Sequence, residues 1–105
     1  MTNPRRGDVF LVSLDPVRGS EIAKTRPCLI VSPDVLNDRF STVIVAPLTS
    51  TEKPYPTRCR VEVKGRPGYV ALDQIRTISR ERLIKRVAAV DPSIALEILR
   101  EIFAD

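Results

Sequence analysis

A short charged loop holds the residues of this chain whose types are best suited to chemistry. Glu21 lies within five positions of three cations, Arg18, Lys24 and Arg26. Guanidinium and ammonium groups bind phosphate oxygens, and a carboxylate beside them can take or give a proton. The combination suits a phosphodiester as substrate. A solvated surface loop has a similar composition, so these residue types alone leave both interpretations open.

Two apolar runs, residues 9–12 and 28–31, hold the ends of this loop. We expect them to form central strands over 8–14 and 28–32, the second buried on both faces because its apolar run is unbroken. Such strands would present the loop, residues 15–27, on a rigid scaffold, where binding and catalytic residues are common.

Short strands and tight turns make up most of the remaining chain. Pro47 is expected to end the strand before it, because proline donates no hydrogen bond to a ladder, and residues 65–68 are expected to form a hairpin turn. The other strands are predicted over residues 42–46, 58–64, 69 onward, 75–78 and 85–90, with a loop over 48–56 and short helical turns near 33–37 and 79–83.

One longer helix is predicted at the C-terminal end. Asp91 supplies an N-cap acceptor and Pro92 suits the first helical position. Apolar residues then recur at helical spacing and are expected to pack on the core: Ile94, Ile98, Leu99 and Ile102. The whole pattern predicts a mainly β fold with a C-terminal helix, a small SH3-like β-barrel, although a sandwich fits nearly as well. We expect residues 1–105 to form a single domain.

Composition narrows the possible chemistry. The chain has no histidine, which removes the commonest general acid or base and the usual partner of a catalytic serine or cysteine. Cys28 and Cys59 fall in predicted strands and lack the close spacing of a zinc site, so we expect free thiols, no metal and no cofactor. A disulfide between them is a less favoured alternative. Any catalysis must therefore use carboxylate, guanidinium, hydroxyl or amine groups.

Charge and hydropathy indicate the partners and the location. The formal net charge is +4, and most basic residues are arginines, which match phosphate groups with a planar fork of donors. Nucleic acid is thus favoured over a membrane. No apolar run approaches the roughly 20 residues that span a bilayer, and no signal-peptide core is present, so we expect a cytoplasmic protein. Part of the stability of so short a chain is expected to come from a partner subunit.

Six short strings occur in the same order as in a known family. They read Arg6-Gly7-Asp8-Val9, Leu14-Asp15-Pro16, Gly19-Ser20-Glu21, Arg26-Pro27, Ala46-Pro47-Leu48-Thr49-Ser50 and Leu72-Asp73-Gln74-Ile75-Arg76-Thr77-Ile78. Each string is weak evidence alone, but together they cover nearly the whole length of the chain. In their order and spacing the sequence resembles the MazF/PemK (Kid) toxin family.

This resemblance implies an SH3-like barrel of the CcdB/MazF/Kid type and a homodimer. It further implies a ribosome-independent endoribonuclease that cuts single-stranded messenger RNA at short sequences and leaves 2′,3′-cyclic phosphate and 5′-hydroxyl ends. Such a protein is the toxin of a type II toxin–antitoxin pair, whose antitoxin is expected to fold a disordered acidic segment over the basic groove. The alternatives are a CcdB-like gyrase poison and a non-catalytic barrel that binds RNA or protein.

By match to the family's strings, Arg26 and Thr49 are the expected catalytic pair. Arg26 would stabilise charge on the phosphorane, and Thr49 would donate to a phosphoryl oxygen. Glu21 is expected either to act as general base or to orient Arg26 by an ion pair. One branch of the family has a histidine before this glutamate and an arginine before the Asp-Gln pair, where this chain has Ser20 and Ala71, so a mechanism that depends on those two groups is excluded.

The expected RNA-binding residues lie in or near the same strings: Arg18, Ser20, Lys24, Ser50, Tyr55, Asp73, Gln74 and Arg76. Asp73 is favoured as a structural acceptor or a base-reading group over a direct catalytic role. Tyr55 and Phe40 are the candidate stacking surfaces. Several other basic residues are candidates for RNA contact, although each alone is more simply interpreted as a solvated charge: Arg58, Arg60, Arg80, Arg82, Lys85 and Arg86.

Overall fold

The computed structural model describes residues 3–15 and 18–105. Pro16 and Val17, which belong to the charged loop expected over 15–27, lie outside the described residues. The strands are β1 (Asp8–Ser13), β2 (Thr25–Ile30), β3 (Thr42–Thr49), β4 (Arg58–Val63), β5 (Arg66–Ala71), β6 (Arg76–Ser79) and β7 (Leu83–Ala89). The helical segments are α1 (Asp34–Asn37), α2 (Ser93–Phe103) and the short 3₁₀ turns η1 (Leu72–Gln74) and η2 (Arg80–Arg82).

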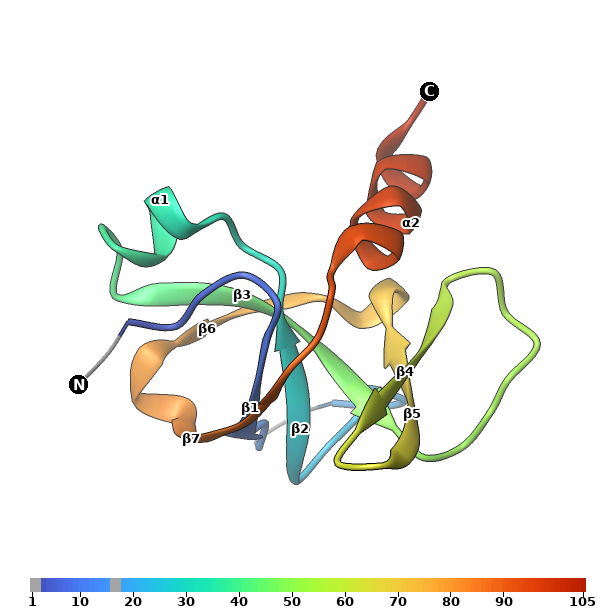
Figure 1. Ribbon diagram of the computed structural model, residues 1–105, viewed down its shortest axis with the longest axis horizontal. Helices are drawn as coiled ribbons and strands as arrows, with labels where there is room; N and C mark the ends of the chain where they lie inside the picture. Colours follow the sequence, from blue (N-terminus) through green and yellow to red (C-terminus); the bar gives the residue numbers. More distant parts are fainter. Residues whose placement is uncertain (1–2, 16–17) are drawn as a thin grey trace.

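The strands form one curled sheet, from which α2 projects (Figure 1). Antiparallel neighbours follow the order β4-β5-β3-β2-β1-β7, and β6 pairs with β3 beside this path. The mainly β, barrel-like fold with a C-terminal helix is thus confirmed, and the sandwich alternative is not, because a single sheet links all the strands. The central positions expected for β1 and β2 are confirmed as well.

Pro47 does not end β3, contrary to the sequence prediction. The strand continues to Thr49 because it changes partners at this proline. Its first part pairs with β2 up to the Cys28–Pro47 position, and its last residues pair with β5, Leu48 opposite Val70. A proline is tolerated where a ladder stops. As a result, Thr49 lies at the end of a strand rather than in a loop.

β2 begins at Thr25, three residues earlier than expected, and ends at Ile30. The extension is held by β1, with Val12 opposite Arg26 and Leu11 opposite Pro27. Pairing with β3 starts only at Cys28. Arg26 therefore lies on a strand and not in the charged loop predicted over residues 15–27.

The turn between β4 and β5 is tighter than the four-residue turn predicted over 65–68. Val63 pairs with Arg66, so only Lys64 and Gly65 form the turn, and both have positive φ angles, 52° and 78°. This is the conformation of a two-residue hairpin, for which glycine is the favoured second residue. Arg66 and Pro67 consequently belong to β5, and Pro67 lies beyond the end of β3, where no ladder bond is lost.

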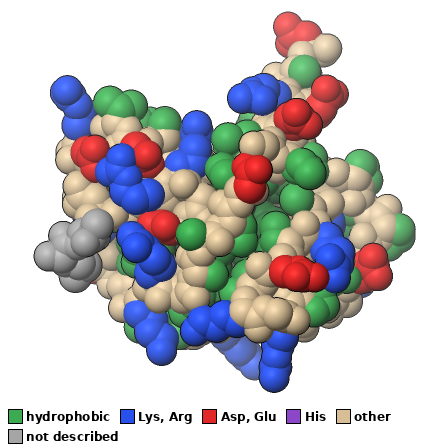
Figure 2. Space-filling model, in the orientation of Figure 1, with side chains coloured by type: hydrophobic (Ala, Val, Ile, Leu, Met, Phe, Trp, Pro, Cys, Tyr) green, Lys and Arg blue, Asp and Glu red, His purple; other side chains and the backbone are tan. Residues whose placement is uncertain are grey.

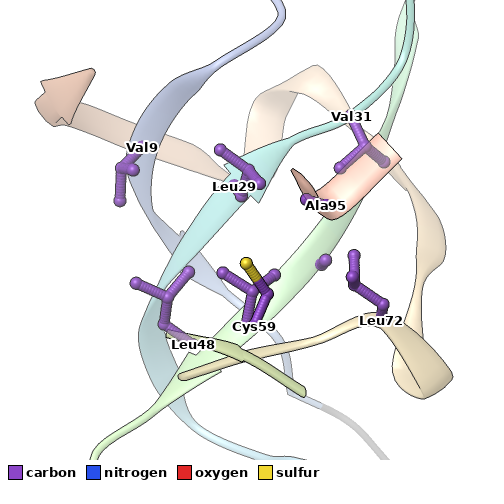
Figure 3. Close-up of a cluster of buried hydrophobic side chains, with 9 residues drawn as sticks. Val9, Leu29, Val31, Leu48, Cys59, Leu72 and Ala95 are labelled. Carbon is purple, nitrogen blue, oxygen red and sulfur yellow. The ribbon is translucent and has the colours of Figure 1, made fainter. Parts of the chain in front are cut away.

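Buried side chains pack on both faces of the sheet, because consecutive residues of a strand point to opposite sides. One group includes Phe10, Cys28 and Val45. Figure 3 shows the other group, in which Leu29 and Leu48 converge with side chains from β4, η1 and the first turn of α2. The free thiols expected for both cysteines are confirmed.

The apolar stripe predicted for α2 packs only in part. Ile98 and Leu99 contact the core together with the buried Ala95. Ile94 is 63% exposed and Ile102 is 39% exposed, since Ile94 lies one residue away from the contacting face and the helix extends beyond the body of the molecule (Figure 1). The helix begins at Ser93, one residue later than predicted, with Pro92 and not Asp91 at the N-cap position, although Asp91 Oδ1 accepts from the Ser93 backbone N–H at 3.0 Å.

Candidate active site

The start of β2, the end of β3 and the start of β5 surround a cavity of about 390 Å³, here named the Arg26 cavity. Its charged lining side chains are all cationic, Lys24, Arg26 and Arg66, and its hydroxyl groups include those of Thr49 and Ser50. Figure 2 shows Lys and Arg side chains gathered along the lower edge of the molecule, below β2 and the β4–β5 hairpin. This cavity suits an anion.

The chain enters β2 through an unusual backbone conformation. Lys24 has a φ of 71°, in the left-handed region that non-glycine residues rarely adopt. Two hydrogen bonds hold it there, from Lys24 N–H to Asp15 Oδ1 at 2.9 Å and from Leu14 N–H to Lys24 C=O at 3.0 Å. They close the base of the charged loop and direct the next residues, including Arg26, along the cavity wall.

Arg26 and Thr49 are arranged as hydrogen-bond donors. Arg26 lies two residues before Cys28 and Thr49 lies two residues after Pro47, the last pair of the β2–β3 ladder, and both residues line the Arg26 cavity. Arg26 Nε donates to the Ala23 carbonyl at 2.9 Å, which orients the guanidinium and leaves its terminal nitrogens without a partner among the described residues. Thr49 Oγ1 accepts from the Thr51 backbone N–H at 3.2 Å, so its own proton is free to be donated.

A second cavity of about 380 Å³ is here named the Glu21 cavity. Pro47 lines it, whereas the next residue, Leu48, lines the Arg26 cavity. It contains most of the other predicted site residues: Ser20, Glu21, Asp73, Gln74 and Arg76. Unlike the first cavity, it mixes carboxylate, amide and guanidinium groups, the types of group that read nucleobase edges.

Glu21 is held by its own loop. Its side chain is exposed, and Oε1 accepts from the Arg18 backbone N–H at 2.6 Å. The following residue, Ile22, donates its N–H to Gln74 Oε1 at 2.8 Å, which ties the loop to η1. Arg26 and Glu21 form no ion pair with each other in the described structure.

Asp73 accepts hydrogen bonds from other side chains of the protein, which agrees with the structural role, one of the two roles predicted for it. Its Oδ1 accepts from Thr57 Oγ1 at 3.0 Å and from Arg58 Nε at 3.1 Å. Burial alone would raise the pKa of this carboxyl, but the hydrogen bonds from Arg58, its own backbone and Thr57, with the Arg58 charge, hold the pKa below its usual value. Asp73 therefore stays ionised near neutral pH.

Several arginines that were candidates for RNA contact make hydrogen bonds within the protein. Arg58 is 10% exposed and pairs with Asp73. Arg76 Nη1 donates to the Leu14 carbonyl at 3.1 Å. Arg80 donates to the Asn37 carbonyl at 3.2 Å, and Arg82 donates to the Ser13 carbonyl at 3.1 Å. The solvated-charge interpretation is wrong for these four, because each guanidinium links segments far apart in the sequence.

Most of the predicted site residues are thus divided between the two cavities. Arg18 and Tyr55 line neither cavity. Arg66 lines the Arg26 cavity but was absent from the predicted set, because the turn predicted over residues 65–68 included it, whereas the actual turn is only Lys64 and Gly65. The tight Lys64-Gly65 turn was the signal that could have assigned Arg66 to a strand.

Two kinds of feature are absent from the described residues. Residues 3–15 and 18–105 contain no group of three or more His, Cys, Asp or Glu side chains able to hold a metal ion. Over the same residues, no helix is long and apolar enough to cross a membrane. The expectation that the reaction needs no metal stays a prediction.

Residues 5–103 match the model of a protein family described as PemK-like, MazF-like toxins of type II toxin–antitoxin systems. The chain belongs to this family. A relative in this family from Staphylococcus epidermidis, endoribonuclease MazF, is 36% identical over 100 residues, which cover 90% of this chain and 83% of the relative. The expected family is therefore confirmed.

Solved structures of MazF-like proteins show a similar fold. A MazF crystal structure from Deinococcus radiodurans superposes with a TM-score of 0.86 at 24% identity and full coverage of both chains. A mycobacterial endoribonuclease in complex with its cognate antitoxin has a TM-score of 0.78 at 26% identity and covers 93% of this chain and 92% of that one. The curled sheet and C-terminal helix described above are thus shared with MazF toxins.

Proposed function

We propose that this toxin is an endoribonuclease that cuts single-stranded messenger RNA, without the ribosome, in the Arg26 cavity. The observation that carries the proposal is the pairing of Arg26 and Thr49 in one cationic cavity, each with donor groups free for a ligand. The endoribonuclease relatives support the same activity. They favour it over a gyrase poison and over a non-catalytic barrel.

The chemistry uses the RNA's own nucleophile. The 2′-oxygen attacks phosphorus as a base takes its proton, the bond from phosphorus to the 5′-oxygen breaks, and that oxygen takes up a proton as it leaves. The products are a 2′,3′-cyclic phosphate and a 5′-hydroxyl. Arg26 and Thr49 donate to the non-bridging oxygens, where negative charge develops in the transition state. Lys24 and Arg66 lie in the same cavity and contribute positive charge.

Glu21 is proposed as the general base. Its alternative role, the orientation of Arg26, is less well supported because the backbone carbonyl of Ala23 already orients that guanidinium. The carboxylate is exposed at the Glu21 cavity, where a bound RNA strand would cover it. Ser20, Asp73, Gln74 and Arg76 in that cavity, with Arg18, Ser50 and Tyr55 around it, are proposed to bind the RNA.

The proposed partners follow from charge and exposed apolar surface. An antitoxin with a disordered acidic segment complements the cationic Arg26 cavity, and the mycobacterial relative is itself bound to a cognate antitoxin. A homodimer is proposed because Ile94 and Phe103 of α2 are 63% and 72% exposed, and a second subunit would remove this apolar surface from water. We further propose that residues 1–105 act as one domain and that the protein works in the cytoplasm, where its substrate lies.

The test is digestion of a long mixed-sequence RNA by the purified protein in EDTA, with Arg26→Ala as the paired variant. Expected are discrete fragments with 2′,3′-cyclic phosphate ends that disappear with the variant. Arg39→Ala, which removes an exposed arginine that lines neither cavity, should cut like the wild type. Intact RNA at high protein concentration would contradict the proposal.

A further inference from the structure

Arg58 connects two residues that would otherwise be independent. Its guanidinium carbon lies 5.3 Å from the centre of the Tyr55 ring, and its Nε donates to Asp73 Oδ1 at 3.1 Å. Backbone hydrogen bonds hold both partners close, from Arg58 N–H to the Tyr55 carbonyl at 3.1 Å and from Leu72 N–H to the Thr57 carbonyl at 3.0 Å. One guanidinium thus fixes an aromatic ring and a carboxylate at the same place.

The burial of Arg58 excludes a role as a simple phosphate contact. Its side chain is only 10% exposed, whereas that of Asp73 is 37% exposed and Tyr55 is 48% exposed. A ligand therefore meets the tyrosine and the aspartate, with the arginine behind them. Replacing Arg58 should change how these two residues are presented and not remove a direct contact.

Tyr55 has the geometry of a stacking surface. The guanidinium covers one face of the ring, and the large exposed fraction of the residue leaves the other face open to a second planar group. Stacking of a base on an aromatic ring stabilises binding for every base type, so it adds affinity but little sequence preference. Phe40 is similarly exposed, 54%, but follows α1 on the opposite side of the molecule from the β3–β4 loop (Figure 1).

Asp73 adds the group that can discriminate between bases. The side-chain hydrogen bonds that it accepts both end on Oδ1, and Oδ2 has no side-chain donor in the described part of the chain. The residue lines the Glu21 cavity. An ionised carboxylate oxygen only accepts hydrogen bonds, so a base edge that meets it must present an N–H.

We propose that Arg58 is a positioning residue that holds Tyr55 and Asp73 as one recognition unit for a single unpaired nucleobase of the RNA. Tyr55 stacks on the base and Asp73 accepts a hydrogen bond from its edge. The inference rests on the proposed endoribonuclease function and deepens it, because it states how one nucleotide near the cleaved bond is selected. Arg58 itself does not touch the RNA.

The test compares steady-state kinetics and the nucleotide preference at each position around the cut, mapped on a mixed-sequence RNA. Tyr55→Ala should raise KM about ten-fold with an unchanged kcat and an unchanged preference. Asp73→Asn should weaken or invert the preference at one position, because an amide can present an N–H where the carboxylate presented an oxygen. Arg58→Met should produce both effects, and adding Tyr55→Ala to it should raise KM little further.

The outcomes separate the inference from the proposed function. Nucleotide preferences are ratios, so they do not depend on how much of a variant is folded, and Phe40→Ala should match the wild type in KM and in preference. A wild-type protein that leaves RNA intact overturns the proposed function and this inference with it. A wild-type protein that cuts, beside an Arg58→Met variant that loses only kcat or folded fraction, overturns the inference alone.

Discussion

Arg26 and Thr49 each lie two residues beyond the last pair of the β2–β3 ladder, Cys28 and Pro47, and line the same cationic cavity. Neither residue is in a loop, although both lie in stretches of sequence that are rich in turn-forming residues. Each already makes one hydrogen bond to the backbone, which holds the side chain in place before RNA arrives. Preorganised donors of this kind lose little entropy on binding and are effective in stabilising a transition state.

Removing either donor should slow cleavage strongly. Arg26→Ala and Thr49→Val are each expected to lower kcat by a factor of about 10² to 10³, the usual effect of losing one well-placed donor. KM should change much less than kcat. Single-turnover cleavage of a defined RNA measures this, with Thr49→Ser as the control that retains a hydroxyl. Rates within a few-fold of wild type would show that the reaction takes place elsewhere.

Glu21→Gln tests the proposed base. The amide oxygen can still accept from the Arg18 N–H, so the loop should keep its shape, while proton abstraction is lost. We expect kcat to fall by about 10² to 10⁴, with RNA affinity nearly unchanged. If kcat stays the same and KM rises, Glu21 serves in binding only.

Gln74 is expected to support the loop that carries Glu21. Gln74→Met removes the acceptor for the Ile22 N–H, and loss of one such bond costs about 1 kcal/mol of stability. Thermal unfolding should show a small decrease in Tm, accompanied by slower cleavage. Gln74→Glu keeps an acceptor at this position and should recover most of both losses; equal behaviour of the two variants would argue against a role for this hydrogen bond.

Asp34 should make stability depend on pH in the acid range. The backbone N–H of Arg6 and the Arg5 guanidinium beside it hold the pKa of this carboxyl below its ordinary value of 3.8. The unfolded chain therefore takes up a proton first as the pH falls, so the stabilisation is present at neutral pH and is lost as pH falls through the folded-state pKa. Urea unfolding at several pH values should show that wild type exceeds Asp34→Asn at pH 7 and converges with it in acid. A constant difference would contradict this linkage.

The cysteines should be unreactive in the folded protein. Burial raises the pKa of the Cys28 thiol to about 12, and burial also raises that of Cys59. Since the thiolate is the reactive form, a thiol reagent at pH 7.5 should label neither residue until the protein unfolds. Mass spectrometry of the labelled protein, with and without denaturant, gives the measurement; rapid labelling of the native protein would be the opposite result.

The fold could be predicted from local pattern because alternation and β-branched runs mark strands wherever one face is buried. The site was harder to predict. Arg26 and Thr49 were identified through the family's strings and not through spacing, since the register that brings them together depends on where β3 changes partners. Arg66 was missed because the turn predicted over residues 65–68 included it, whereas the turn ends at Gly65 and Arg66 belongs to β5.

The arginines that form hydrogen bonds within the protein show a second reason why the site could not be predicted fully from the sequence. Nothing in the residues around Arg58 indicates that it pairs with Asp73, fifteen positions later, because the contact exists only once β4 and η1 are adjacent. The same holds for Arg82 and the Ser13 carbonyl. A long cationic side chain contacts whatever acceptor the tertiary structure brings near it, so sequence alone cannot separate an arginine that binds RNA from one that links strands.

The change of partners within β3 also bears on synthesis of the protein. The Arg26 cavity takes residues from β2, β3 and β5, and β3 is completed by pairing with β6, which ends at Ser79. Most of the chain must therefore have left the ribosome before the cavity can form. A ribosome-bound chain that has not yet released β5 therefore lacks the complete Arg26 cavity.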